Sequence, residues 1–334
     1  MIPQRYYFWE RGAISHLFFC AIHKKRLILR HYFQNSFLLS NQYIFIMKRT
    51  FLSLMCLFTL SGMLFAQHGK VIENCTFHSS ILNMDRPFAV YLPAGYDEST
   101  CSYPVLYLLH GHGDDHTGWV QFGQVAYIAD KAIAEGKACP MIIVMPNGDA
   151  VHKGYFNLWD GSYNYEDYFF KELIPYVEKN FRTRTQRRYR AISGLSMGGG
   201  GTLYYTLHHP ELFAAACPLS GALGGWNLQR MAENVDMTKI KKADLEKYSR
   251  ALNSRNLIED ATPEKLKLIK SVRWYISCGD DDFLYRDNSE IHMLFREKEI
   301  PHEYRVKDGA HTWTYWRMEL AEVLPFITRS FCQY

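Results

Sequence analysis

Residues 188–201 read RYRAISGLSMGGGG, and they place a single serine, Ser196, among glycines directly after a short β-prone apolar stretch. Gly194 and Gly198 flank this serine in the pattern G-x-S-x-G, which is typical of a sharp turn between a strand and a helix that exposes a reactive hydroxyl. Side chains at the two flanking positions would collide with the neighbouring strand and helix, and glycine avoids the collision. The alternative interpretation is a glycine-rich loop that binds phosphate or only packs closely.

Short apolar runs recur on both sides of this turn and alternate with amphipathic segments. The expected strands cover residues 104–110, 140–146, 188–193, 214–220, 272–278 and 302–308, after an antiparallel pair at 71–79 and 86–93. Residues 126–136, 165–181 and 318–331 have the apolar spacing of helices. Continuous apolarity predicts strands that are buried on both faces. The alternation therefore predicts one α/β domain with a mostly parallel central sheet and helices on both faces.

Residues that could serve as the base and the orienting acid for this serine occur later in the chain. A serine hydroxyl is a poor nucleophile unless a base takes its proton, and the base needs an acid to orient it. Three consecutive aspartates, 280–282, follow one predicted strand, and His311 follows the next. Because the carboxyl ends of parallel strands meet at one edge of the sheet, we expect these groups to lie close to Ser196. Spacing alone does not distinguish among the three aspartates.

The loop LLHGHGDDHTGW, residues 108–119, follows the first parallel strand and is also rich in glycine. Its glycines let the backbone approach a substrate, so this loop is expected to donate an N–H to a developing oxyanion. Its three histidines also allow a metal site, although their spacing matches no zinc-protease motif. The aspartates at 280–282 lack the ligand spacing of a calcium-binding EF-hand. We therefore expect neither a metal nor an organic cofactor.

Four other histidines are interpreted as non-catalytic. His208 and His209 lie at the far end of the helix that follows Ser196, and we interpret them as surface or helix-capping groups. His292 and His302 flank a later helix and are interpreted as structural.

Residues 47–66, MKRTFLSLMCLFTLSGMLFA, combine two positive charges, an apolar run and a small residue before a polar break. This pattern predicts a signal peptide that is cleaved after Ala66. Because a signal peptide begins at the initiating methionine, residues 1–46 are expected not to be native. The alternative is a true extension followed by a membrane anchor, which the short apolar run disfavours. Residues 67–334 would then be one catalytic domain, secreted or periplasmic and not stably inserted in a membrane.

Cysteine usage and charge set further expectations. In an oxidising compartment, Cys75 and Cys101 are the preferred disulfide pair if one forms. Cys139, Cys217 and Cys278 lie in or beside apolar runs and are expected to be buried thiols. The net charge of +4 over 334 residues gives no support for a nucleic-acid partner.

One long polar insertion, residues 221–271, interrupts the pattern. It is interpreted as a lid, a wall that faces the substrate, or a plain surface insertion.

Taken together, the motifs resemble the putative-esterase family of α/β-hydrolases. This family includes feruloyl and acetylxylan esterases, S-formylglutathione hydrolase, tributyrin esterases and mycolyltransferases. The resemblance runs from about residue 72 to residue 328. It is carried by the stretches VLYLLHGHGDDHTGW, YFFKELIPYVEKNF, AISGLSMGGGGTLYYTLHHPELFAAACPLSG, CGDDDFLY and GAHTWTYW.

Carried over position by position, the resemblance implies a catalytic triad. Ser196 would be the nucleophile, His311 the base and Asp282 the acid that orients the base. Asp282 is chosen over its two neighbours because the acid of the family falls four residues after the position of Cys278.

The resemblance also implies an oxyanion hole formed by the backbone N–H groups of Met197 and His112. Several members of the family have an apolar residue at the position of His112. Trp119, Trp226 and Trp313 are in loops expected around the cleft and could stack on a sugar or an aromatic acyl group, with ordinary packing as an equal alternative.

The expected function is a secreted serine carboxylic-ester hydrolase that acts through an acyl-enzyme, without a cofactor. Its expected partner is a small-molecule or polysaccharide ester, with feruloyl or acetyl esters of plant polysaccharide preferred. The alternatives are a short-chain acyl esterase of the tributyrin type, a thioesterase like S-formylglutathione hydrolase, an acyltransferase, and a noncatalytic carbohydrate-binding protein.

Overall fold

The computed structural model describes residues 25–26, 30, 45–51, 68–148, 154–224 and 240–332. It divides the chain into two units, Met1–Ala66 and Gln67–Tyr334. In the first unit, residues 45–51 are helical, and the rest of the predicted signal peptide lies outside the described residues. Within the described ranges, no helix has both the length and the apolar character needed to cross a membrane.

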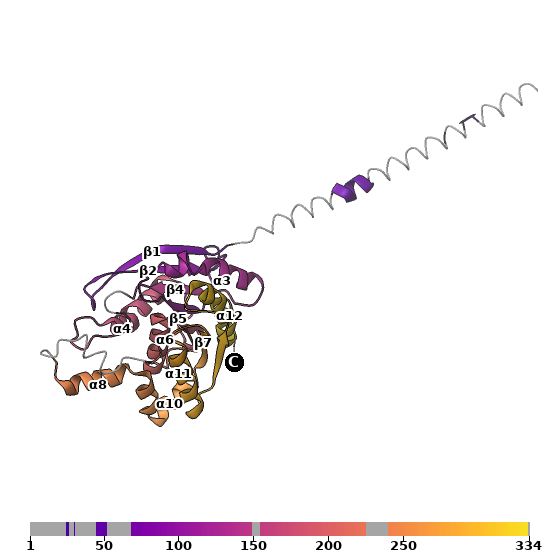
Figure 1. The fold of residues 1–334 in the computed structure, drawn as a ribbon. Coiled ribbons are helices and arrows are strands. Elements are labelled where there is room, and N and C mark those ends of the chain that lie inside the picture. Colours follow the sequence, from indigo (N-terminus) through magenta and orange to yellow (C-terminus); the bar gives the residue numbers. More distant parts are fainter. Residues whose placement is uncertain are drawn as a thin grey trace, which may run out of the picture. The chain divides into compact units, whose positions relative to one another are not determined.

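Eight strands form one sheet in the second unit (Figure 1). The strands are β1 (Lys70–Ser79), β2 (Met84–Leu92), β3 (Val105–Leu109), β4 (Ile142–Pro146), β5 (Arg190–Leu195), β6 (Ala215–Leu219), β7 (Arg273–Gly279) and β8 (His302–Lys307). Their spatial order is β1-β2-β4-β3-β5-β6-β7-β8. β2 is antiparallel to both β1 and β4, and the other neighbouring strands are parallel. The predicted mostly parallel sheet is confirmed.

Helices cover both faces of this sheet. α3 (Val125–Ala134) packs with α12 (Trp313–Cys332) on one face, while α6 (Met197–His208) and α11 (Tyr285–Glu297) belong to the core on the other face. The remaining helical elements are α2 (Gly118–Gln121), α4 (Tyr165–Tyr168), a π-helical turn (Phe169–Leu173), α5 (Ile174–Asn180), a 3₁₀ turn (Arg187–Tyr189), α8 (Lys242–Leu252), α9 (Ser254–Glu259) and α10 (Pro263–Lys270).

The side chains of β3 show why continuous apolar runs form the centre of the fold. Leu106 and Leu108 point into the core beneath α3 and α12, while Val105, Tyr107 and Leu109 point into the opposite core. All five are buried. Full burial of one such apolar side chain stabilises the fold by about 1.5–3 kcal/mol, so a strand of this composition is stable only between two layers of helices.

The structure corrects two details of the expected helices. The last helix begins at Trp313, five residues before the predicted start at 318. The predicted helix at 165–181 is divided into α4, the π-helical turn and α5. Pro175 follows that wide turn and has no N–H to donate to an α-helical partner. The described part of the insertion at 221–271 consists of residues 221–224 and 240–271, and it contains α8, α9 and α10.

The thiols of Cys75 and Cys101 are both free, so the predicted disulfide is not formed in this structure. Cys75 is partly buried and packs against the core, whereas Cys101 is exposed. Cys217 and Cys278 are buried as predicted, and Cys139 is only partly buried.

Candidate active site

Ser196 lies at the turn between β5 and α6. Its backbone has a conformation that residues other than glycine rarely adopt. Its φ is 53° and its ψ is −115°. A Cβ added to Gly194 would lie 2.5 Å from the carbonyl oxygen of Gly198, and a Cβ added to Gly198 would lie 2.6 Å from the carbonyl oxygen of His110. Both flanking positions therefore require glycine. A strained turn of this kind costs on the order of 1–3 kcal/mol and is typical of functional sites.

Three side chains from separate loops form a continuous hydrogen-bonded row. Nε2 of His311 is 2.9 Å from Oγ of Ser196, and Nδ1 of His311 is 2.8 Å and 3.0 Å from the two carboxylate oxygens of Asp282. An ionised carboxylate only accepts hydrogen bonds, so Nδ1–H must donate to Asp282. Nε2 of the neutral ring is then free to accept the serine proton, which is the arrangement that a general base needs.

Asp282 is the one buried member of the three consecutive aspartates. Its side chain is 1% exposed, whereas Asp280 and Asp281 are exposed. Its Oδ1 also accepts a hydrogen bond from the backbone N–H of Leu284, at 2.9 Å. Burial alone would raise the pKa of the Asp282 carboxyl, but the hydrogen bonds from His311 and Leu284 hold this pKa below its usual value. Asp282 therefore stays charged beside the imidazole.

The loops that carry Asp282 and His311 are held together by one side chain and by their backbones. Oδ1 of Asp280 accepts the N–H of Gly309 at 2.9 Å, and the N–H of Asp281 donates to the carbonyl of Gly309 at 3.1 Å. Figure 1 shows β7, whose carboxyl end leads into the first of these loops, beside α11. Sequence reasoning missed the positioning contact made by Asp280, because nothing in the sequence indicates that the loop after β8 folds back onto it.

Gly279→Ala is expected to lower kcat/KM by about 10²-fold, because a Cβ at Gly279 would lie 2.0 Å from the carbonyl oxygen of Gly309. A methyl group there forces the two loops apart, and a misplacement of about 1 Å in catalytic geometry can reduce the rate to this extent. Steady-state ester hydrolysis measures the effect. Gly69→Ala is the control, since its Cβ would meet a backbone carbonyl of β2 at 2.7 Å outside these loops. Equal losses in both variants would contradict the argument.

Met197 and His112 belong to the two backbone segments next to Ser196. Met197 is the first residue of α6, where N–H groups have no helical partner and the helix dipole is positive. His112 follows Gly111, whose Cβ would lie 3.4 Å from Cβ of Ser196, so this loop passes next to the serine. Within the described ranges, no residue accepts a hydrogen bond from the N–H of Met197 or of His112. Both N–H groups are therefore available to a ligand.

His110 has a structural role. Its Nδ1–H donates to the carbonyl of Gly111 at 2.9 Å, and its Nε2 accepts the N–H of Gly148 at 2.8 Å. Burial lowers the pKa of His110 to about 4, so the ring is neutral and both of its nitrogens are engaged. Among the described side chains, the histidines of the 108–119 loop do not converge as a group of metal ligands.

The structure describes two of the three tryptophans expected near the substrate, and they differ in burial. Trp119 is 1% exposed, donates its indole N–H to the carbonyl of the last β3 residue at 3.0 Å, and meets Trp313 edge to face at 5.2 Å. Its burial contradicts a stacking role, because apolar packing covers its ring. Trp313 is partly exposed and contacts Trp316, which in turn packs edge-on against His311. Trp226 lies outside the described residues.

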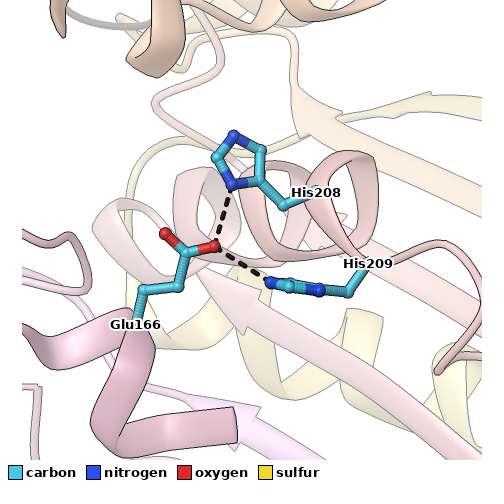
Figure 2. A group of neighbouring side chains, drawn as sticks. All are labelled: Glu166, His208 and His209. Atoms are coloured by element: carbon cyan, nitrogen blue, oxygen red, sulfur yellow. Dashed lines mark hydrogen bonds and ion pairs between the residues drawn. The ribbon is translucent and has the colours of Figure 1, made fainter.

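A second polar cluster, formed by Glu166, His208 and His209, lies at the other end of α6 (Figure 2). Nδ1 of His208 and Nε2 of His209 are 2.8 Å and 3.1 Å from the same oxygen, Oε1 of Glu166. Burial alone would raise the pKa of Glu166, but the hydrogen bonds from both histidines lower it to about 2. His209 is the C-cap residue of α6 and both histidines stay partly exposed, which agrees with their interpretation as surface or capping groups, but the sequence did not indicate their shared partner. They bind a buried carboxylate from α4, which no local pattern reveals.

His292 of α11 and His302 of β8 are hydrogen-bonded to each other, with 2.7 Å between Nδ1 of His292 and Nε2 of His302. Their rings also pack against Tyr304 and Phe295, respectively. This agrees with the structural role expected for both.

Comparisons with known proteins agree with the fold. The family model described as Putative esterase matches residues 79–327. An endo-1,4-beta-xylanase/feruloyl esterase of Xylanibacter ruminicola is 38% identical over 259 residues, which are 75% of this chain and 30% of that protein. The chain thus spans less than a third of the length of this curated relative.

Solved structures resemble the chain over most of its length. A ferulic acid esterase is 35% identical with a TM-score of 0.69, and the match covers 79% of this chain and 99% of the other. The S-formylglutathione hydrolase of Staphylococcus aureus is 25% identical with a TM-score of 0.63, and the match covers 78% and 99% of the two chains. Because the family model spans most of the chain and the fold is that of the esterase structures, the protein belongs to the Putative esterase family and has the α/β-hydrolase fold.

Proposed function

We propose that the protein hydrolyses esters through an acyl-enzyme formed on Ser196. The row of hydrogen bonds from Ser196 to His311 to Asp282 is the observation that carries this proposal. Oγ of Ser196 attacks the ester carbonyl carbon while Nε2 of His311 takes the hydroxyl proton. Asp282 stabilises the imidazolium that forms. The same proton then passes to the departing alcohol oxygen as the C–O bond breaks.

Water completes the reaction in a second, equivalent half. His311 takes a proton from water, and the resulting hydroxide attacks the acyl carbon. The proton then returns to Oγ of Ser196 as the carboxylic acid leaves. In both halves the carbonyl oxygen becomes negative. We propose that the N–H groups of Met197 and His112 stabilise that charge, since they are fixed in place before the reaction begins.

We propose feruloyl or acetyl esters of plant polysaccharide as the substrates, with feruloyl esters preferred. The names of two relatives support this preference, since one combines a xylanase with a feruloyl esterase and the other is a ferulic acid esterase. An exposed aromatic side chain next to His311 also supports this preference. Phe283 is 70% exposed, and its ring centroid is 4.4 Å from that of His311. An aromatic acyl group held on Ser196 can stack on this ring.

Action on a polysaccharide requires the enzyme to reach its substrate outside the cytoplasm. We therefore propose that residues 47–66 direct export and that residues 67–334 form the catalytic domain. The charged start and the apolar run at 47–66 support this proposal.

A panel of four substrates is expected to separate the possible functions. With full-length protein, we expect kcat/KM to be at least about tenfold higher for methyl ferulate than for tributyrin or S-formylglutathione, which corresponds to about 1.4 kcal/mol in transition-state binding. Release of acetate from acetylated xylan is expected as well. The highest kcat/KM for S-formylglutathione would contradict the polysaccharide proposal and favour the thioesterase.

Phe283→Ala extends this test, because loss of the ring should lower kcat/KM for methyl ferulate by about three- to tenfold and leave that for tributyrin nearly unchanged. Tyr127→Ala is the matched control, since Tyr127 is an aromatic residue of α3 with similar exposure, 65%. A carbohydrate-binding protein without catalytic activity would hydrolyse none of the four substrates.

A further inference from the structure

The cluster of Glu166, His208 and His209 takes no part in the proposed hydrolysis. α6 has 12 residues, and Ser196 precedes its first residue while His208 is its last. At 1.5 Å per residue, the cluster is roughly 18 Å from the nucleophile. Figure 2 shows the carboxylate of Glu166 directed from α4 toward the two imidazoles, which come from the end of α6. This remote cluster therefore needs an explanation of its own.

The three donor atoms converge on one point. Oε1 of Glu166, Nδ1 of His208 and Nε2 of His209 all lie within 4.8 Å of one another. A tetrahedral zinc ion with bonds of about 2.0–2.1 Å holds its ligand atoms roughly 3.3 Å apart. The two nitrogen-to-oxygen distances, 2.8 Å and 3.1 Å, differ from this value by only a few tenths of an ångström.

The outward-facing nitrogens of the two imidazoles give an independent indication. Nε2 of His208 is 3.4 Å from the carbonyl oxygen of Ala251, and Nδ1 of His209 is 3.6 Å from a carboxylate oxygen of Glu211. A neutral imidazole that donates to Glu166 turns a lone pair toward that second oxygen, which is repulsive, and only a protonated ring would donate to both oxygens. If the inner nitrogen binds a metal instead, the outer N–H can donate to the oxygen, as it does in almost all metal-bound histidines.

The side chains of the cluster are also held in place before any ion arrives. The ring of His208 is 4.1 Å from that of Tyr204, and the ring of His209 is 4.0 Å from that of Phe170. The hydroxyl of Tyr204 donates to the second oxygen of Glu166 at 2.8 Å. The side chains of His208 and His209 remain 22% and 34% exposed, so the cluster borders the solvent.

We propose that Glu166, His208 and His209 bind a divalent transition-metal ion of the zinc type, with water as the fourth ligand. Two imidazoles and one carboxylate suit zinc, whereas calcium and magnesium prefer oxygen ligands throughout. The ion joins α4 to the end of α6 and thereby stabilises the helix that begins at the nucleophile. Its role is structural, and ester hydrolysis does not pass through it.

Titration of full-length protein with Zn²⁺ alone, in a non-chelating buffer, tests this proposal by calorimetry. We expect one ion per chain in the wild type and a Kd at least tenfold weaker in both Glu166→Gln and His209→Asn. His292→Asn is the matched control, because it removes a histidine from the hydrogen-bonded pair outside the cluster. Zn²⁺ should raise the Tm of the wild type and of His292→Asn, and not that of Glu166→Gln.

Two further measurements keep the proposal testable if one variant folds poorly. Co²⁺ in place of Zn²⁺ should give the intense visible absorption of a tetrahedral site in the wild type and lose it in His209→Asn. Tributyrin hydrolysis should persist in His209→Asn, as evidence that the variant is folded. The proposal is overturned if the wild type binds no Zn²⁺, if both cluster variants bind it as the wild type does, or if His292→Asn alone loses binding.

Discussion

Ser196→Ala is expected to lower the kcat for hydrolysis of p-nitrophenyl acetate by about 10⁴- to 10⁶-fold. The variant lacks the only atom that can form the acyl-enzyme, and removal of the serine from a comparable triad has an effect of this size. Full-length wild type and variant are compared by nitrophenolate release, and circular dichroism verifies the fold. Ser80→Ala is the control, because Ser80 is exposed in a turn where its backbone N–H makes the contact. Undiminished turnover by Ser196→Ala would exclude this nucleophile.

Ser196→Gly separates the loss of chemistry from the loss of fold. The positive φ of residue 196 is strained for alanine as it is for serine, but glycine adopts it readily. We therefore expect Ser196→Gly to be as inactive as Ser196→Ala and more stable, by about 1 kcal/mol in the free energy of unfolding. A thermal melt of the two variants measures this difference. If Ser196→Gly were the less stable of the two, the turn would not be strained.

The sequence predicted the sheet because its decisive signals are local. A strand such as β3 must be apolar on both faces when helices cover both, and this requirement is visible in five consecutive residues. The turn at Ser196 was predicted for the same reason, since the two glycines that permit it are its sequence neighbours. Trp119 shows the limit of such signals, because a tryptophan in a loop near a cleft can equally be directed into the core.

Contacts between distant segments could not be predicted in this way. The carboxylate that holds His208 and His209 comes from 42 and 43 residues earlier in the chain, on a different helix. Nothing in the local pattern around those histidines indicates a buried partner. The same holds for the contact of Asp280 with Gly309, which depends on how two loops pack. The choice of Asp282 over its neighbours came from the family resemblance, and burial supplies the physical reason for it.

Asp282→Asn is expected to lower kcat by about 10³- to 10⁴-fold while leaving the fold intact. The carboxylate forces Nδ1 of His311 to carry the proton, whereas an amide can donate to Nδ1 and thereby move that proton to Nε2. A protonated Nε2 in the neutral ring cannot take the proton of Ser196, and the same substitution in a well-studied triad has an effect of about 10⁴-fold. Steady-state kinetics with p-nitrophenyl acetate measure the loss.

The neighbouring aspartates provide controls that share chemistry, sequence context and loop with Asp282. Asp281 is exposed and contributes its backbone N–H, so Asp281→Asn should keep kcat within about twofold of the wild type. Asp280→Asn should fall between the two, since an amide oxygen can still accept the N–H of Gly309. A larger loss for Asp281→Asn than for Asp282→Asn would mean that another carboxylate orients His311. The order of the three losses therefore tests which carboxylate acts on the imidazole, and it does so independently of the identity of the ester.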